Sequence, residues 1–243
     1  MELYYDLHTH SCLSPCADDD MTVYNIANMA MLCGLDIVAL TDHNSAKNCP
    51  AFFAACREAG LTPVAGVELC TREEVHVLCL FPGLGEAAAF DGFLYPLLPD
   101  IENRADIFGR QLILGEDDAV RAEEKKLLIS ACDIGIEELP AVVAEYGGIA
   151  IPAHIDRPAN GLIANLGFIP DEYVFTCYEI KNPDALPNLV RNNPCLARKR
   201  ILFDSDAHTL TDIPERRHSL SLPERSAAAL IAALRSAPPA AWA

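Results

Sequence analysis

Short apolar runs alternate with amphipathic stretches along nearly the whole chain, and this alternation constrains the fold more than any other feature of the sequence. Most of the runs are rich in Val, Ile, Leu and Tyr and have the length of strands. They span residues 3–7, 36–40, 62–67, 75–81, 148–152, 173–180 and 200–203. Repeated strand–helix units of this kind predict an α/β protein with a parallel sheet, either open or closed into a barrel.

The stretches between the runs carry helix signals. The first predicted helix runs to residue 32, with Thr22 as its N-cap and Gly34 just past its end. Further helices are predicted over residues 51–59, 136–146 and 223–237. Strand and helix signals therefore alternate to the end of the chain.

Residues 82–133 interrupt this alternation, because they contain no clean strand–helix unit and many acidic side chains. A helix is predicted near 119–131 within them. We expect one domain over residues 1–243, with 82–133 inserted over one end of the sheet. The insertion is either a lid or a solvated acidic connection.

The charge and the cysteines restrict the possible partners and location. Against 35 Asp and Glu stand only 18 Lys and Arg, which gives a formal net charge of −17. We therefore expect no stable binding of duplex nucleic acid, which requires a basic face.

No apolar run has the length of a membrane span, and no signal peptide is visible, so we expect a cytoplasmic protein with reduced thiols. Cys12 and Cys16 are expected to pack in their loop, and the oligomeric state leaves no trace in the sequence.

Histidines follow the strand-like runs, and their placement indicates the chemistry. Five of the seven histidines lie at or just past the end of a run: His8, His10, His43, His154 and His208. His76 lies inside the run 75–81, Glu68 ends another run, and Asp206 follows the run 200–203. Because the carboxyl ends of parallel strands meet at one edge of a sheet, these side chains are expected to converge.

Converging imidazoles and carboxylates are the ligands of a transition-metal cluster. A single histidine at a strand end has a structural role about as often as a functional one, but several such histidines without a cation would be costly to bury. Imidazole suits Zn, Mn or Fe, whereas Mg²⁺ or Ca²⁺ alone would be bound by oxygen. The candidate ligands exceed what one ion uses, so two or three divalent ions are expected. Clusters bridged by hydroxide hydrolyse phosphate esters.

The histidine motifs resemble those of the PHP (polymerase and histidinol phosphatase) family of metal-dependent phosphoesterases. The matching motifs run from Asp6 to Ser11, from Thr41 to Asn44, from Gly66 to Glu68, at His76, from Pro152 to His154 and from Ser205 to His208. The resemblance implies a distorted (β/α)7 barrel with the metal cluster at the C-terminal ends of the strands. It implies one ion held by His8, His10, Glu68 and Asp206, and a second held by Glu68, His76 and His154.

The third ion implied by the resemblance would be bound by His43, His208 and an acidic residue or histidine of the loop after His10. This loop departs from the family pattern, because Pro15 follows Ser14. Counting back from Thr22 favours Asp18, with Asp20 as the alternative and Asp19 also open. These three carboxylates could equally be favourable charges near a helix N-terminus.

The expected activity is hydrolysis of a small phosphomonoester by a metal-bridging hydroxide. The residues expected to act in catalysis are His43, His208, Asp206 and Glu68. Arg157 is the main candidate for contact with the substrate phosphate, and Arg72 and Lys181 are weaker ones. The alternatives are a nuclease or nucleotidase acting on nucleoside bisphosphates or short oligonucleotides, a histidinol phosphatase, and a non-enzymatic regulatory or scaffold module that binds metal.

Overall fold

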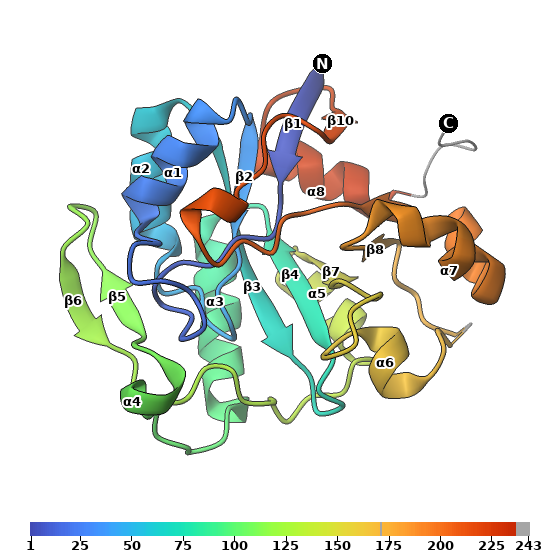
Figure 1. Ribbon diagram of the computed structural model, residues 1–243, viewed down its shortest axis with the longest axis horizontal. Helices are drawn as coiled ribbons and strands as arrows, with labels where there is room; N and C mark the ends of the chain where they lie inside the picture. The colour runs from blue at the N-terminus through green and yellow to red at the C-terminus, as the bar shows by residue number, and fades with distance from the viewer. Residues whose placement is uncertain (171, 237–243) are drawn as a thin grey trace.

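A curled, open sheet forms the centre of the computed structural model, which describes residues 1–170 and 172–236 (Figure 1). Six strands are hydrogen-bonded in the order β10-β1-β2-β3-β4-β7. Their bounds are Glu2–Asp6 for β1, Ile37–Leu40 for β2, Thr62–Cys70 for β3, His76–Phe81 for β4, Ile149–Pro152 for β7 and Ser219–Ser221 for β10. Two further pairs are β5 (Leu112–Leu114) with β6 (Val120–Glu123), and β8 (Cys177–Glu179) with β9 (Arg200–Leu202).

The strand directions correct the prediction of a parallel sheet. Strands β1, β2 and β3 are parallel, but β4 is antiparallel to both β3 and β7. A tight turn joins β3 to β4, in which Thr71 N donates to Val75 O at 2.9 Å, so no crossover helix fits between them. The α/β class is confirmed, but the described strands form a curled half-barrel sheet instead of a closed (β/α)7 barrel.

Helices cover both faces of this sheet. Their bounds are Val23–Leu32 for α1, Cys49–Ala59 for α2, Leu84–Leu94 for α3, Ala105–Phe108 for α4, Leu139–Glu145 for α5, Leu162–Leu166 for α6, Leu186–Asn192 for α7 and Ala227–Arg235 for α8. Alternate residues of β2 face opposite sides. Val38 and Leu40 belong to the apolar core that contains residues of α1, α2, α3 and α5, whereas Ile37 and Ala39 belong to the core that contains α8.

The helix ends agree with the sequence signals. The Thr22 side chain accepts a hydrogen bond from Asn25 N at the start of α1, and Gly34 follows the helix with φ +75°. The last predicted helix is α8, which is shorter than expected, and residue 237 lies outside the described residues. No helix in the described part of the chain has the length and apolar character needed to cross a membrane.

The predicted helix at 119–131 is wrong, because its first residues form β6, which pairs with β5 in a hairpin. The hairpin is held by polar contacts with distant residues. The Asn48 side chain donates to Leu112 O at 3.0 Å and accepts from Leu114 N at 2.9 Å, and Gln111 Nε2 donates to the carbonyl oxygens of Glu124 and Lys126. The local helical pattern of residues 119–131 does not record such contacts, so the sequence did not reveal the hairpin.

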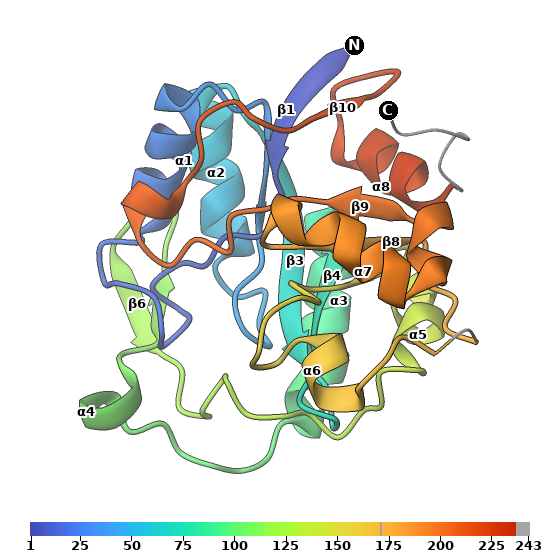
Figure 2. The same cartoon turned by 45° about the vertical axis from the view of Figure 1, so that its right-hand side comes forward.

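Strands β8 and β9 extend the curl of the sheet past β7, with α7 beside them (Figure 2). Ile155 N, just after β7, donates to Glu179 O at 3.0 Å. The carboxyl ends of β1, β2, β7, β8 and β9 therefore open toward one region, which the next section describes.

Candidate metal centre

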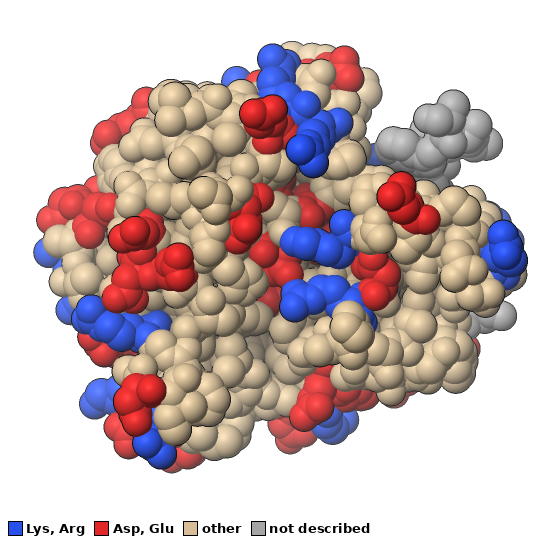
Figure 3. All heavy atoms as spheres, in the orientation of Figure 1, with Lys and Arg blue, Asp and Glu red and all other residues tan. Residues whose placement is uncertain are grey.

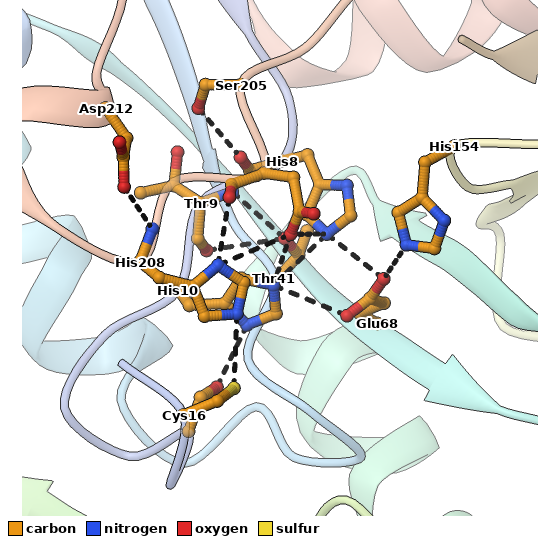
Figure 4. Close-up of polar contacts among 12 residues, drawn as sticks. His8, Thr9, His10, Cys16, Thr41, Glu68, His154, Ser205, His208 and Asp212 are labelled. Carbon is orange, nitrogen blue, oxygen red and sulfur yellow. Dashed lines mark hydrogen bonds and ion pairs between the residues drawn. The ribbon is translucent and has the colours of Figure 1, made fainter. Parts of the chain in front are cut away.

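The histidines and carboxylates that follow separate strands lie together (Figure 4). His8 and His10 follow β1, His154 follows β7, and Asp206 and His208 follow β9. These residues come from both ends of the chain, and the parallel strands bring them to one edge.

His76 joins the cluster because β4 runs in the opposite direction. It is the first residue of β4 and pairs with Cys70, the last residue of β3. The start of an antiparallel strand lies at the same edge as the ends of its neighbours, which explains why this histidine lies near the start of its apolar run instead of at the end.

Four side chains form the largest group: His8, His10, Glu68 and Asp206. The Nε2 atoms of His8 and His10 lie 3.1 Å apart, and Asp206 Oδ1 lies 3.3 Å from each of them. Glu68 Oε1 lies 3.2 Å from His8 Nε2, and its Oε2 lies 3.3 Å from His10 Nε2. Two ligand atoms bonded to one zinc ion at about 2.1 Å lie roughly 3.0–3.4 Å apart. The group therefore fits one divalent cation.

Glu68 connects this group to a second one. His76 Nδ1 lies 2.9 Å and His154 Nε2 lies 3.0 Å from Glu68 Oε1, and His43 Nδ1 lies 3.0 Å from Glu68 Oε2. The ligand atoms of His43, Glu68 and His76 lie within 4.8 Å of one another. A carboxylate with imidazoles on both oxygens is suited to bridge two cations.

A third group consists of His10, His43 and His208. The ring centroids of His10 and His208 are 4.3 Å apart, and those of His10 and His43 are 4.6 Å apart. The structure thus brings together eight of the nine side chains for which we predicted metal binding: His8, His10, His43, Glu68, His76, His154, Asp206 and His208.

Hydrogen-bond partners on the outer side of the cluster orient the imidazoles. Glu179 Oε2 lies 2.8 Å from His8 Nδ1 and accepts a hydrogen bond from it. Ser14 Oγ lies 3.0 Å from His10 Nδ1 and itself donates to Asp42 at 2.7 Å, so His10 Nδ1 is the donor. Both histidines therefore direct Nε2 toward the group, which leaves that nitrogen to bind a metal.

The histidines of the cluster differ in the direction in which their surroundings shift the pKa. Burial alone would lower the pKa of His8, but the carboxylates of Glu179, Glu68 and Asp206 outweigh it and raise the pKa well above its ordinary value. Burial lowers the pKa of His43 well below its ordinary value. Burial and the nearby His10 lower the pKa of His208 to about 4. His43 and His208 therefore keep free lone pairs at neutral pH.

The carboxylates stay ionised despite their burial. Burial would raise the pKa of Glu68, but His76, His8 and His43 lower it well below its ordinary value. Burial likewise opposes the effect of His8 and His10 on Asp206, whose pKa is lowered. Two buried anionic carboxylates therefore face the imidazole nitrogens.

Several buried atoms of the cluster lack a hydrogen-bond partner among the described residues. They are His43 Nδ1, Glu68 Oε2, His154 Nδ1 and Asp206 Oδ1. Leaving such groups unpaired costs free energy, and cations would satisfy them. His154 and Asp206 also adopt left-handed backbone conformations, with φ +29° and +50°. Strain of this kind is concentrated at functional sites.

The loop expected to supply a carboxylate for the third ion brings a different side chain. Asp18 is exposed, and the contact it makes here is from its backbone N to His208 O at 3.0 Å. Asp19 and Asp20 are exposed as well. Among the described residues, none of the three carboxylates belongs to a group of three or more candidate ligand atoms within 4.8 Å of one another. Cys16 Sγ, in contrast, lies 3.1 Å from His208 Nε2.

The three basic residues predicted to contact substrate lie in different places. Arg157 donates to Asp206 Oδ2, and Lys181 Nζ donates to Ser205 O, so both lie at the cluster. Arg72 instead forms an exposed ion pair with Asp133. Figure 3 shows Lys and Arg atoms next to Asp and Glu atoms in the hollow near the middle of this face. Arg157 and Lys181 are thus placed to meet an anion, and Arg72 is not.

Sequence reasoning missed the supporting residues Glu179, Ser14 and Asp42. Glu179 ends β8, so the rule applied to the histidines would have identified it. Asp42 lies inside the Thr41–Asn44 motif but was given no role, although it accepts from Ser11 N and from two serine hydroxyl groups. Ser14 has no signal in the sequence, because its role depends on the course of the loop.

Comparison with known proteins agrees with this geometry. The family model for the PHP domain matches residues 6–139, more than half of the chain. The chain belongs to the PHP family. A comparison with curated protein sequences found no match.

Solved structures of PHP-type proteins share the fold. The lesion-specific endonuclease Q from Pyrococcus furiosus matches with a TM-score of 0.66 and 18% identity, over 97% of this chain and 56% of that one. An endonuclease Q in complex with a 27-mer duplex that carries an abasic lesion at its active site gives 0.63 and 19%, over 86% and 50%. A proposed metal-dependent phosphoesterase from Bifidobacterium adolescentis gives 0.58 and 18%, over 84% and 87%. This PHP chain spans little more than half the length of the two endonucleases.

The prediction of no duplex nucleic-acid partner is contradicted by this comparison, because a protein of the same fold is seen with a DNA duplex at its active site. The prediction relied on the net charge of the whole chain. Local charge governs a site, and here Arg157 and Lys181 lie where cations would also bind.

Proposed function

We propose that this PHP protein hydrolyses a phosphoester with two or three divalent ions, Zn, Mn or Fe, bound at the strand-end cluster. The observation that carries the proposal is the group of His8, His10, Glu68 and Asp206, with contacts of 3.1–3.3 Å among their ligand atoms. Membership in a family of metal-dependent phosphoesterases supports it.

The proposed ligand sets share Glu68. His8, His10, Glu68 and Asp206 would hold one ion, Glu68 would share a second with His76 and His154, and His43 and His208 would hold a third where it is present. Bound divalent cations would lower the pKa of bound water towards about 7 and neutralise phosphoryl charge.

The protein's own residues position the substrate. Arg157 contacts Asp206, and its half-exposed side chain is free to exchange this carboxylate for a substrate phosphate. Lys181, which donates to Ser205 O, would place a second positive charge beside the same anion. We assign His43 and His208 to ligand binding instead of proton donation, because their lowered pKa values leave them unprotonated at neutral pH.

The preferred substrate is a small phosphomonoester, whose dianionic phosphate suits two basic side chains and a cation cluster. Cleavage of a phosphodiester in a nucleic acid is the second candidate. It is favoured by the likeness to endonuclease Q, which extends over 97% of this chain. A purely regulatory or scaffold module is disfavoured, because eight of the predicted ligands lie together.

The test is hydrolysis by protein loaded with Mn²⁺ or Zn²⁺. An aryl phosphate, a nucleoside bisphosphate, a 5′-phosphorylated oligonucleotide and a duplex with an abasic site are compared at equal concentrations. We expect the highest kcat/KM for a monoester, and loss of all hydrolysis in His8→Ala. His218→Ala is the matched control, because His218 packs on Phe203 outside the cluster.

Preferred cleavage of an oligonucleotide or of the lesion duplex would select the second candidate. Full activity of His8→Ala, or no hydrolysis of any of the four substrates by metal-loaded protein, would refute the proposal.

A further inference from the structure

The inserted segment 82–133 returns to the metal centre near its end, where one asparagine side chain holds it. Asn44 directly follows the proposed ligand His43 and is 1% exposed. Its Nδ2 donates to Leu128 O at 2.6 Å and to Ser130 O at 2.8 Å. Both protons of this amide are therefore used on carbonyl oxygens of the inserted segment.

The oxygen of the same amide contacts both the sheet and the inserted segment. Asn44 Oδ1 accepts from Cys70 N, at the end of β3, at 3.0 Å and from Cys132 Sγ at 3.3 Å. Cys132 N also donates to Cys70 O at 2.8 Å. The amide thus has partners for its two protons and its oxygen, and this network fixes which atom is the oxygen.

The backbone around Asn44 leads to three of the proposed ligands. His43 forms an isolated parallel bridge with Glu68, and Asn44 N donates to Glu68 O at 2.9 Å. Cys70, which the Asn44 side chain contacts, pairs with His76 across β3 and β4. His43, Glu68 and His76 form one of the groups whose ligand atoms lie within 4.8 Å of one another.

The backbone conformation of Asn44 is unusual for a residue with a side chain. Its φ is +47°, in the left-handed region that asparagine tolerates better than most residues. A conformation of this kind persists where the surrounding contacts determine it. At Asn44 the hydrogen bonds of the backbone and of the side chain do so together.

We propose that Asn44 is a positioning residue that ties residues 128–132 to His43, Glu68 and His76. The inserted segment thereby braces the part of the metal centre in which Glu68 would be shared between cations. Asn44 would act through the backbone of His43 and Glu68, and not as a ligand. The inference rests on the metal centre of the proposed function, but not on its substrate.

The direct test compares Zn²⁺ binding by metal-free full-length wild type and Asn44→Gly in an isothermal titration. Glycine adopts the left-handed conformation readily, so this variant removes the amide and keeps the backbone accessible. We expect at least one Zn²⁺ per chain to bind about 10- to 100-fold more weakly, as for other residues that support ligands. At saturating Zn²⁺, kcat and KM for an aryl phosphate should return to the wild-type values.

Gln111→Ala is the matched control. Gln111 is also a buried amide, and its side chain bonds to Glu124 O, Lys126 O and Leu128 N, all within the inserted segment. Leu128 is therefore held by Asn44 through its oxygen and by Gln111 through its nitrogen. Gln111→Ala should lower the Tm, but it should leave the Zn²⁺ affinity at the wild-type value.

A second measurement uses the wild type alone, so it does not depend on the folding of Asn44→Gly. Because coupling between two sites is reciprocal, bound metal should also stabilise the inserted segment where Asn44 holds it. Hydrogen exchange followed by mass spectrometry should become slower at residues 128–132 when Zn²⁺ is added. Exchange in the β5–β6 hairpin should stay unchanged.

The outcomes separate this inference from the proposed function. Wild-type Zn²⁺ affinity in Asn44→Gly, or an equal loss of affinity in Gln111→Ala, would overturn the role of Asn44 and leave the phosphoesterase proposal intact. Exchange at residues 128–132 that does not respond to Zn²⁺ would overturn that role as well. Absence of any bound Zn²⁺ in the wild type would overturn both.

Discussion

The strand-end cluster and the segment 82–133 surround buried carboxylates in opposite ways. In the segment, Glu124 accepts from Lys47, from Tyr95 Oη and from two backbone amides. In the cluster, Glu68 and Asp206 each keep a buried oxygen without a hydrogen-bond partner among the described residues. The carboxylate of Glu124 is satisfied by protein groups alone, whereas cations would satisfy those of Glu68 and Asp206. The two regions should therefore respond differently to the loss of metal.

Removal of divalent cations should have the largest effect, because it acts on every ligand at once. An ion at about a hundredfold excess over its Kd contributes about 2.7 kcal/mol to stability. Chelation should therefore lower the Tm by roughly 5–10 °C and abolish hydrolysis. Hydrogen exchange should increase near His8, Glu68 and Asp206, but not in the β5–β6 hairpin. Equal increases in both regions would contradict the comparison.

Substitution of a single ligand should have the next largest effect. Asp206→Asn removes one negative charge from the four-ligand group and the carboxylate that Arg157 contacts. We expect kcat/KM to fall by more than about 100-fold, since changes outside the ligands already cost 10- to 100-fold. Asp117→Asn, in the inserted segment, changes an exposed carboxylate paired with Arg121 and should leave kcat/KM unchanged. Equal losses of kcat/KM in the two variants would show that the change of charge, and not the loss of a metal ligand, lowers kcat/KM.

A smaller loss is expected for Glu179→Gln, which leaves every proposed ligand in place. Glu179 accepts from His8 Nδ1 and holds the ring in the metal-binding tautomer. Metal affinity should fall by about 10- to 100-fold. Isothermal titration with Zn²⁺ measures this change, and excess metal should rescue much of the activity. A variant with unchanged affinity would remove Glu179 from the positioning of His8.

The smallest effect is expected in the inserted segment, on stability alone. Burial would raise the pKa of Glu124, but Lys47 and the amide of Lys126 outweigh it and lower the pKa. Its stabilisation is therefore present above the pKa of an unfolded glutamate and is lost as pH falls through the lowered folded value. Glu124→Gln should reduce the free energy of unfolding by about 1–3 kcal/mol near neutral pH, with kcat unchanged.

Urea denaturation near neutral pH and in acid measures the difference in the free energy of unfolding between wild type and Glu124→Gln. This difference should become smaller in acid. Glu123→Gln, at an exposed neighbouring residue, is the control. A difference between wild type and Glu124→Gln that widens in acid would contradict the assigned ion pair.

The sequence predicted the cluster far better than the inserted segment, and the reason is physical. A residue just past a buried strand is placed by the strand, so His8, His154 and Asp206 converge wherever the sheet forms. The β5–β6 hairpin depends on Asn48 and Gln111, which act across distances in the chain that local patterns do not record. The direction of β4 was missed for a similar reason, because it depends on the length of one turn.

The loop after His10 marks the limit of reasoning by resemblance. The family pattern, counted back from Thr22, favoured Asp18, but the turn at Pro15 brings Cys16 toward His208. Counting residues cannot reveal which side chain a turn directs inward.

The cluster joins the first strand of the chain to a loop that lies almost two hundred residues further on. His8 and His10 are synthesised early, but Asp206 and His208 emerge from the ribosome last among the ligands. A nascent chain that ends before Asp206 cannot form the four-ligand group, so it cannot capture a cation there during translation. Metal binding by these four ligands would thus begin only after Asp206 is synthesised, and it would report that β1 and the segment after β9 have met.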